Sequence, residues 1–350
     1  MGLLMMKGIG ISGTGRIGRL LIRKIMSNDT MKDSLKVINS TYPTETVAHL
    51  LKYDSVHGRW DAKIEIVEDT LIINGNAIKM SNTRQPEDIP WKENGVALVL
   101  DATGKFNDHT GSKRHLAAGA EAVIITAPGK EMDATIVMGV NQNKLNLREH
   151  KLISAASCTT NCTAPVLKVL DDAFGVKQGW LTTVHAFTSD QKLLDNPHKD
   201  LRRARSATSS IVPTSTGVGK ALKEVIPHLA PVMQGTALRV PTQDVSLIDL
   251  TVQLSKEMSV EDVKEAFLNI KDENLAKVVG TNDEPLVSID FVGSEHSAVV
   301  DLDSIMVMGD QLKIMAWYDN EWAYASRVCE LADLVKRGIE ENEHNSTVFA

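Results

Sequence analysis

The apolar positions in the first half of the chain predict strands that alternate with helices. Continuous apolar runs that end at glycine, proline or a polar residue are typical of strands buried on both faces. Such runs occupy 97–104 and 122–129, and further strands are predicted at 7–12 and 34–39. Segment 16–28 has apolar residues at helical spacing, and 111–120 resembles a short helix that ends at glycine. Because helical crossovers join parallel strands, we expect an α/β domain with a doubly wound parallel sheet.

Beyond about residue 153 the pattern changes to longer strands, several of which alternate between apolar and polar positions. The predicted strands lie at 179–187, 236–242, 245–254, 286–293, 297–309 and 311–319. Helices are predicted at 163–175 and 260–270. Alternating strands joined by short turns are typical of antiparallel sheets. We therefore expect an α+β second domain with a largely antiparallel sheet.

These patterns predict a first domain at 1–156 and a second domain at 157–320. Segment 321–338 carries one apolar stripe at helical spacing, formed by Ala325, Val328, Cys329, Ala332 and Val335. We expect this segment to form a helix that packs back on the first domain. Residues 339–350 show no periodicity, which predicts a loose tail.

Composition and charge narrow the class of protein. The chain has 350 residues and a formal net charge of −7, which argues against nucleic acid or an acidic membrane as a general partner. A local basic patch remains at 199–205. No apolar run approaches the ~20 residues of a membrane span. Three cysteines in so long a chain form no disulfide framework, which favours a reduced, cytoplasmic setting.

The first strand leads into a glycine-rich turn, Gly13-Thr14-Gly15-Arg16-Ile17-Gly18. This G-x-G-x-x-G pattern gains weight from its position between a strand and a helix, where Rossmann domains bind a dinucleotide. Gly13 permits the tight turn, Gly15 allows the pyrophosphate to approach, and Gly18 allows helix and strand to pack closely. The alternative is an ordinary glycine-rich turn between a strand and a helix.

The second strand lacks the acidic residue that binds the adenosine ribose in NAD sites. Ser40 and Thr41 follow this strand, and no Asp or Glu lies in 37–43. Without a carboxylate, a ribose 2′-phosphate is not repelled and hydroxyl groups can receive it. We therefore expect NADP to be preferred and NAD to be accepted. The alternative is that Ser40 is a neutral turn residue and NAD binds well.

Cys158 precedes a helical run, and a helix N-terminus favours a thiolate. His185 lies on a predicted strand and would lower the pKa of the thiol further if it faced that helix end. Cys162 is one helical turn away, but the chain offers too few further ligands for a zinc site, and we expect no metal. Cys158 could instead be an inert packing residue, and inert packing is the favoured interpretation for Cys162. For a lone histidine such as His185, a structural role is the default.

Several longer motifs carry a resemblance to a known family. They are GTGRIGR, AHLLKYDSVHGR, SAASCTTNCTAPV, TTVHAFTSDQ, PHKDLRRAR, STG, RVPT and WYDNEWAY. In number, order and spacing these motifs are similar to those of phosphorylating glyceraldehyde-3-phosphate dehydrogenases, from about residue 7 to residue 338. The resemblance implies a Rossmann domain, a catalytic domain and a homotetramer.

The resemblance also implies the chemistry. Cys158 would attack the aldehyde of glyceraldehyde 3-phosphate to form a hemithioacetal, hydride would pass to the nicotinamide, and inorganic phosphate would split the thioester. His185 would activate the thiol and take the hydroxyl proton. The product would be 1,3-bisphosphoglycerate.

Further site residues are implied by matching positions. Thr188 and Arg239 match the residues that hold the substrate's phosphate. The inorganic-phosphate side is matched by Ser157, Thr159, Arg203, Thr216 and Gly217. The cofactor contacts are matched by Arg16, Ile17, Arg84, Thr126 and Asn320, with Asn320 at the nicotinamide amide.

Departures from the family pattern favour the NADP-linked, biosynthetic type. Ser40 stands where NAD-using members carry Asp, and Asn196 stands where they often carry Leu. A role in gluconeogenesis follows from this resemblance. The alternatives are an erythrose-4-phosphate dehydrogenase, disfavoured by Thr188, Thr216 and Gly217, and a redox sensor or adhesion protein on the same fold.

Overall fold

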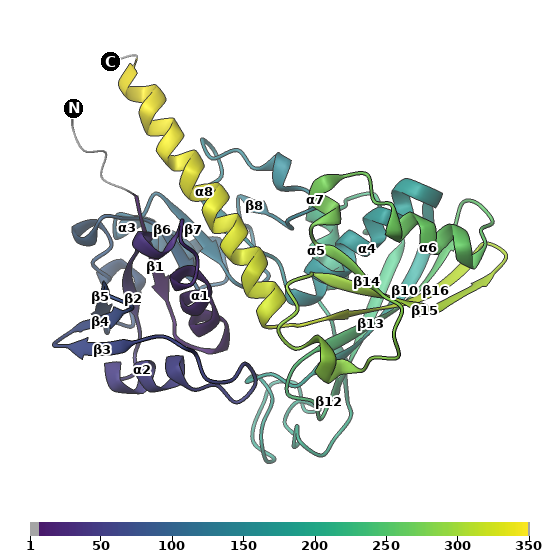
Figure 1. Cartoon of the computed structure of the whole chain (residues 1–350), viewed down its shortest axis with the longest axis horizontal. Coiled ribbons are helices and arrows are strands. Elements are labelled where there is room, and N and C mark those ends of the chain that lie inside the picture. Colours follow the sequence, from purple (N-terminus) through teal and green to yellow (C-terminus); the bar gives the residue numbers. More distant parts are fainter. Residues whose placement is uncertain (1–6, 349–350) are drawn as a thin grey trace. The chain divides into compact units, whose positions relative to one another are not determined.

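The computed structural model describes residues 7–348, which form two compact units (Figure 1). The first unit contains the chain up to Ile136, Asn143–Ala156 and the residues from Ala325 onward. The second unit contains Val137–Gln142 and Ser157–Tyr324. Each unit is built around its own sheet.

Among the described residues, the first unit has a nine-stranded sheet with the order β3-β4-β5-β2-β1-β6-β7-β9-β8. The strands are β1 (Gly8–Ser12), β2 (Leu35–Asn39), β3 (Ile64–Val67), β4 (Thr70–Ile73), β5 (Asn76–Ser81), β6 (Val96–Asp101), β7 (Ala122–Ile125), β8 (Ala134–Thr135) and β9 (Leu152–Ser154). All neighbours pair in parallel except β3 with β4 and β4 with β5. Strands β1, β6 and β7 are buried throughout, which the continuous apolar runs predict for β6 and β7.

The order of this sheet creates a switch point beside β1. The chain runs outward from β1 to β2 and then returns to β6 on the other side of β1. In open α/β sheets, ligands bind beyond the carboxyl ends of the strands at such a point. Ser12 and Asp101, the last residues of β1 and β6, are paired at this edge.

Of the residues that the structure describes, four α-helices belong wholly or largely to the first unit. They are α1 (Arg16–Met26), α2 (Thr44–Lys52), α3 (His109–Ala117) and α8 (Trp322–Val348). Helix α8 continues past Gly338, where the sequence pattern predicted its end. Gly338 packs so closely on Leu147 that an added Cβ would lie 2.2 Å from that side chain, and Lys336 pairs with Glu340 one turn later. These contacts stabilise the helix beyond Gly338, where the sequence shows no apolar stripe.

Among its described residues, the second unit has a seven-stranded, largely antiparallel sheet with the order β11-β12-β10-β13-β16-β15-β14. The strands are β10 (Val176–Ala186), β11 (Val212–Ser215), β12 (Met233–Val240), β13 (Ser246–Leu254), β14 (Val279–Asn282), β15 (Ala298–Met308) and β16 (Gln311–Tyr318). The helices are α4 (Cys158–Phe174), α5 (Val218–Val225), α6 (Val260–Leu268) and α7 (Glu273–Ala276). Helix α4 packs on β10, β13, β15 and β16 (Figure 1).

The strand predicted at 286–293 is wrong. This segment contains a 3₁₀ turn, Ser288–Phe291, in which the backbone N–H of Val287 donates to the carboxylate of Asp290. Phe291 is buried and stacks on Trp317, while Ile289 is exposed. The apolar character of this segment therefore reflects the packing of Phe291 on Trp317 rather than a strand. In the described part of the chain, no helix has both the length and the apolar character that crossing a membrane requires.

Candidate active site

Cys158 is the first residue of the long helix α4. Ser157 caps this helix, because its hydroxyl accepts the backbone N–H of Thr160 at 3.0 Å. The preceding residue, Ala156, has a positive φ of 56° and so turns the chain sharply into the helix. The thiol therefore lies where unpaired N–H groups and the helix dipole favour negative charge.

The structure brings Cys158 together with His185. The Sγ atom of Cys158 lies 3.4 Å from Nε2 of His185, which is carried by β10. The other ring nitrogen, Nδ1, lies 2.7 Å from the carbonyl oxygen of Ala186. Nη1 of Arg239, which only donates, also lies 3.1 Å from Nδ1, so the two neighbours of Nδ1 favour opposite protonation states of this nitrogen. Nε2 is the ring nitrogen that faces the thiol.

Burial governs the charge of this pair. It raises the pKa of the Cys158 thiol above its ordinary value, although the positive charge of Arg239 and hydrogen bonds at the helix start act in the opposite direction. Burial and the neighbouring Arg239 lower the pKa of His185 to about 3. In this arrangement burial outweighs the helix N-terminus and Arg239, so the pKa of the thiol lies above its ordinary value, contrary to the depressed pKa that the sequence predicts.

Two arginines lie near this pair. Arg239, on β12, donates through Nη1 to Ala186 O at 3.0 Å and to the Thr188 hydroxyl at 3.3 Å. Its Nε is buried and has no partner within the described chain. Burial, and the charge of Arg203, lower the pKa of Arg239. A buried guanidinium with an unused donor beside a second cation is a suitable receptor for a phosphate group.

Arg203 is held by residues of its own unit. It donates to the Thr214 hydroxyl at 3.0 Å and to a carboxylate oxygen of Asp190 at 2.6 Å. Asp190 also contacts His198 at 3.3 Å. Thr216 and Gly217 precede α5, whose first N–H groups add further donors. Asp190 was not singled out from the sequence, where it is one of many acidic residues.

The hydroxyl of Thr159 is not directed to an open site. It lies 3.0 Å from the Tyr318 hydroxyl, which in turn contacts the Thr183 hydroxyl at 2.8 Å. Burial raises the pKa of Tyr318 above its ordinary value. The ring of Tyr318 stands edge-on to His185. Tyr318 therefore helps to fix the imidazole and the first turn of α4, a role that sequence reasoning missed.

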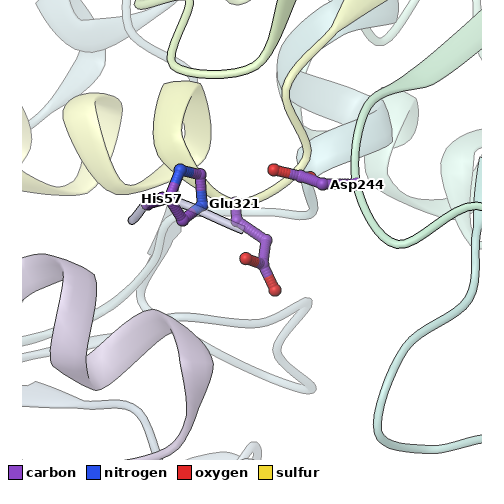
Figure 2. Close-up of side chains that lie close together, drawn as sticks. All are labelled: His57, Asp244 and Glu321. Carbon is purple, nitrogen blue, oxygen red and sulfur yellow. The ribbon is translucent and has the colours of Figure 1, made fainter. Parts of the chain in front are cut away.

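Asn320 lies at the end of the same sheet, beside a group of acidic residues. Its Oδ1 accepts a hydrogen bond from Ser246 at 2.7 Å, which orients the amide. Asp244 and Glu321 are drawn in Figure 2; His57, also labelled there, belongs to the other unit. Burial and the nearby charges of Asp319 and Glu321 raise the pKa of Asp244 to about 9.

The glycine turn of the first unit has the features that a dinucleotide requires. Gly13 has a φ of 97°, and a Cβ on Gly18 would lie 2.0 Å from the carbonyl oxygen of Gly13. A Cβ on Gly15 would meet nothing within 4 Å. Gly15 is also the N-cap of α1 and has no side chain to cap its first N–H groups. Backbone donors and open space beside them fit a pyrophosphate at the switch point.

The other predicted cofactor residues lie around this turn or after nearby strands of the unit. Ser40 is buried, and its hydroxyl contacts Thr14 at 2.6 Å and accepts the N–H of Tyr42 at 3.2 Å. The guanidinium of Arg16 forms a two-pronged ion pair with Asp54, and this pair helps hold the pKa of Asp54 well below its usual range, against burial. Arg84 is exposed after β5, and Thr126 donates its N–H to Asp101 O at 2.9 Å.

Comparison with known proteins gives consistent matches along the chain. The family profile for the NAD binding domain of glyceraldehyde 3-phosphate dehydrogenase matches residues 7–109, and that for the C-terminal domain matches 157–320. Glyceraldehyde-3-phosphate dehydrogenase 2 of Bacillus subtilis is 49% identical over 341 residues, which are 97% of this chain and 99% of the relative.

Two further relatives carry the same description. The protein from Staphylococcus epidermidis strain RP62A is 49% identical over 96% of this chain and 98% of its own length. The protein from Staphylococcus aureus strain MRSA252 is 48% identical over 95% and 96%. The chain belongs to the glyceraldehyde 3-phosphate dehydrogenase family, and is an NAD(P)-dependent enzyme of that family.

Proposed function

We propose that the chain catalyses the reversible, phosphate-dependent oxidation of glyceraldehyde 3-phosphate to 1,3-bisphosphoglycerate, with NADP preferred over NAD, in cytoplasmic gluconeogenesis. The observation that carries this proposal is the 3.4 Å contact between Cys158 Sγ and His185 Nε2 at the start of α4. A nucleophile, a base within reach and a helix N-terminus together make a site for acyl transfer.

In this mechanism His185 acts twice as a base. Its Nε2 first takes the thiol proton as the Cys158 sulfur attacks the aldehyde carbon, and the N–H of Cys158 stabilises the oxyanion that forms. The imidazolium returns its proton to give the hemithioacetal hydroxyl. His185 then accepts the hydroxyl proton as the C–H bond breaks and the thioester forms. The bound nicotinamide supplies the hydride acceptor.

The phosphate-binding residues position the two anionic groups. Arg239 and Thr188 hold the phosphate of the substrate, and the unused Nε of Arg239 is a donor for it. Inorganic phosphate is bound by Arg203, Thr216, Gly217, Ser157 and Thr159, and it attacks the thioester carbon while the sulfur leaves. Because the hydroxyl of Thr159 is engaged by Tyr318, we assign Thr159 a contribution through its backbone.

On the cofactor side, we assign the pyrophosphate to the backbone of Gly13, Gly15, Arg16, Ile17 and Gly18. Arg84 and Thr126 complete this side, and Asn320 holds the nicotinamide amide. The NADP preference is supported by Ser40. Its oxygen already accepts the N–H of Tyr42 and can accept the Thr14 hydroxyl, which leaves the Ser40 proton for a 2′-phosphate.

The proposed homotetramer is supported by exposed apolar side chains in 188–216 of the second unit. Leu193, Leu194, Leu201 and Ile211 are 72%, 75%, 80% and 68% exposed. Side chains of this kind are uncommon in such density on the surface of a monomer.

Steady-state kinetics test the proposal. We expect oxidation of glyceraldehyde 3-phosphate to require phosphate, to exceed oxidation of erythrose 4-phosphate, and to be lost in Cys158→Ser. Ser40→Asp should lower kcat/KM for NADP by about a hundredfold, because a carboxylate would face the 2′-phosphate. Faster turnover with NAD in the wild type would refute the cofactor preference, and full activity of Cys158→Ser would refute the mechanism.

A further inference from the structure

A network of hydrogen bonds lies at the carboxyl end of β6. It joins four side chains, of which three are buried. The indole N–H of Trp91 donates to Nδ1 of His115 at 3.1 Å, and Nε2 of His115 lies 3.1 Å from Oδ2 of Asp101. Oδ1 of Asp101 accepts both the N–H of Thr103 at 2.8 Å and its hydroxyl at 2.6 Å. Trp91, His115 and Asp101 are at most 1% exposed.

The donor and the acceptor of every hydrogen bond in this network follow from the chemistry of the side chains. An indole nitrogen only donates, so Nδ1 of His115 is the acceptor and the ring proton lies on Nε2. Nε2 therefore donates to Asp101. The carboxylate receives three hydrogen bonds from neutral donors. Any other tautomer of His115 would place two donors face to face at Trp91.

This hydrogen-bond network holds the loop 101–105 against the glycine turn. The N–H of Ala102 donates to Ser12 O at 2.7 Å, and the N–H of Lys105 donates to the Thr103 hydroxyl at 3.1 Å. A Cβ added to Gly13 would lie 2.8 Å from backbone atoms of Ala102 and Thr103. The loop therefore packs directly against the glycine turn at the switch point, and a displacement of the loop would displace the turn.

A purely structural purpose would be served more simply by apolar side chains. Replacing a buried ionic or polar group by well-packed apolar residues is often neutral or stabilising, because desolvating a carboxylate is costly. A fully satisfied polar network instead fixes one arrangement of the groups that it joins. Trp91 also packs on β1, where a Cβ on Gly10 would lie 2.4 Å from its ring. The network thus links the underside of β1 to the loop beside its end.

We propose that Trp91, His115 and Asp101 are positioning residues that hold Thr103 and the loop 101–105 in register with the glycine turn, and thereby set the affinity for the dinucleotide. The inference rests on the proposed function only in that a dinucleotide binds at this turn.

The test compares Thr103→Val with Thr103→Ser. Valine has a similar shape but lacks the hydroxyl, whereas serine retains it. We expect Thr103→Val to raise the Kd for NADPH, measured by fluorescence titration, about tenfold, which corresponds to about 1.4 kcal/mol. Thr103→Ser should stay within about twofold of the wild type, and the KM for inorganic phosphate should change little in either variant.

Asp101→Asn provides a second arm. An amide in this place cannot accept from both Thr103 and His115 without bringing two donors together, and we expect the Kd to rise by at least the same factor. Thermal unfolding of each variant is measured in parallel. A lower Tm with an unchanged Kd in Thr103→Val and Asp101→Asn would overturn the inference. A wild-type chain that binds neither NADPH nor NADH would overturn the proposed function together with it.

Discussion

At the scale of single residues, the charge on Arg239 controls the state of the nucleophile. Burial raises the pKa of the Cys158 thiol, and the guanidinium of Arg239 is the largest influence in the opposite direction. We expect Arg239→Gln to raise that pKa further, so the pH profile for alkylation of Cys158 by iodoacetamide moves to higher pH. At pH 7 the rate should fall about fivefold, the ratio that corresponds to ~1 kcal/mol between neighbouring charges.

The matched control is Arg239→Lys, which retains a positive charge and should alkylate with a profile closer to that of the wild type. Rates are followed from pH 6 to pH 10 by mass spectrometry of the peptide that contains Cys158. An identical profile for the glutamine variant would show that Arg239 does not act on the thiol. The neutral imidazole adds no charge in this range, because the pKa of His185 is about 3.

Sequence motifs predict catalytic roles for Cys158 and His185 but could not give their electrostatics. A helix N-terminus is visible in the sequence, so a lowered thiol pKa was the natural prediction. The opposing effect is desolvation, which depends on how β10, β12 and α4 pack around the sulfur. Tyr318 was missed for the same reason, since its partners Thr159 and Thr183 are distant in sequence.

At the scale of elements, two glycines of the glycine turn have different roles. Gly18 allows the helix and the strand to pack closely, and Gly15 allows the pyrophosphate to approach. Gly18→Ala would place a Cβ 2.0 Å from the carbonyl oxygen of Gly13, a contact that backbone movement alone can relieve. We expect a loss of about 3 kcal/mol or more in unfolding free energy, measured by chemical denaturation. Gly15→Ala meets nothing within 4 Å and has a φ of −68°, so stability should change by less than about 1 kcal/mol.

The same pair gives opposite results for binding. Gly15→Ala should fold like the wild type but bind NADPH at least about tenfold more weakly, because the methyl group occupies the path of the pyrophosphate. Equal affinity in the Gly15→Ala variant would place the phosphates elsewhere. A fully stable Gly18→Ala variant would contradict the close packing of α1 on β1.

Element types were predictable where one periodicity extended over a whole segment. Strand β13 alternates buried and partly exposed residues along its length, and the sequence predicted it at 245–254. Strands β3, β4 and β5 were not predicted, because they are short and their longest apolar run, 71–73, has only three residues. The pattern predicted a helix from 163, whereas α4 begins at Cys158, since its polar first turn is capped by Ser157 rather than marked by apolar residues.

At the scale of the whole molecule, the exposed segment 188–216 makes assembly testable. Leu193 and Leu194 are adjacent and are 72% and 75% exposed, so their burial requires a surface outside the described chain. We expect the wild type to sediment as a tetramer in analytical ultracentrifugation. The double variant Leu193→Glu/Leu194→Glu should sediment as smaller species, because it would bury two carboxylates in the interface without partners.

Leu268→Glu is the matched control, since Leu268 is 60% exposed on α6 and lies outside 188–216. It should remain tetrameric. If the double variant also remains tetrameric, the segment does not form the interface, and its leucines need another explanation. If the control dissociates as well, added negative charge rather than lost apolar burial is the cause, since the net charge is already −7. Raising the salt concentration separates these effects, because screening restores assembly only when repulsion is responsible.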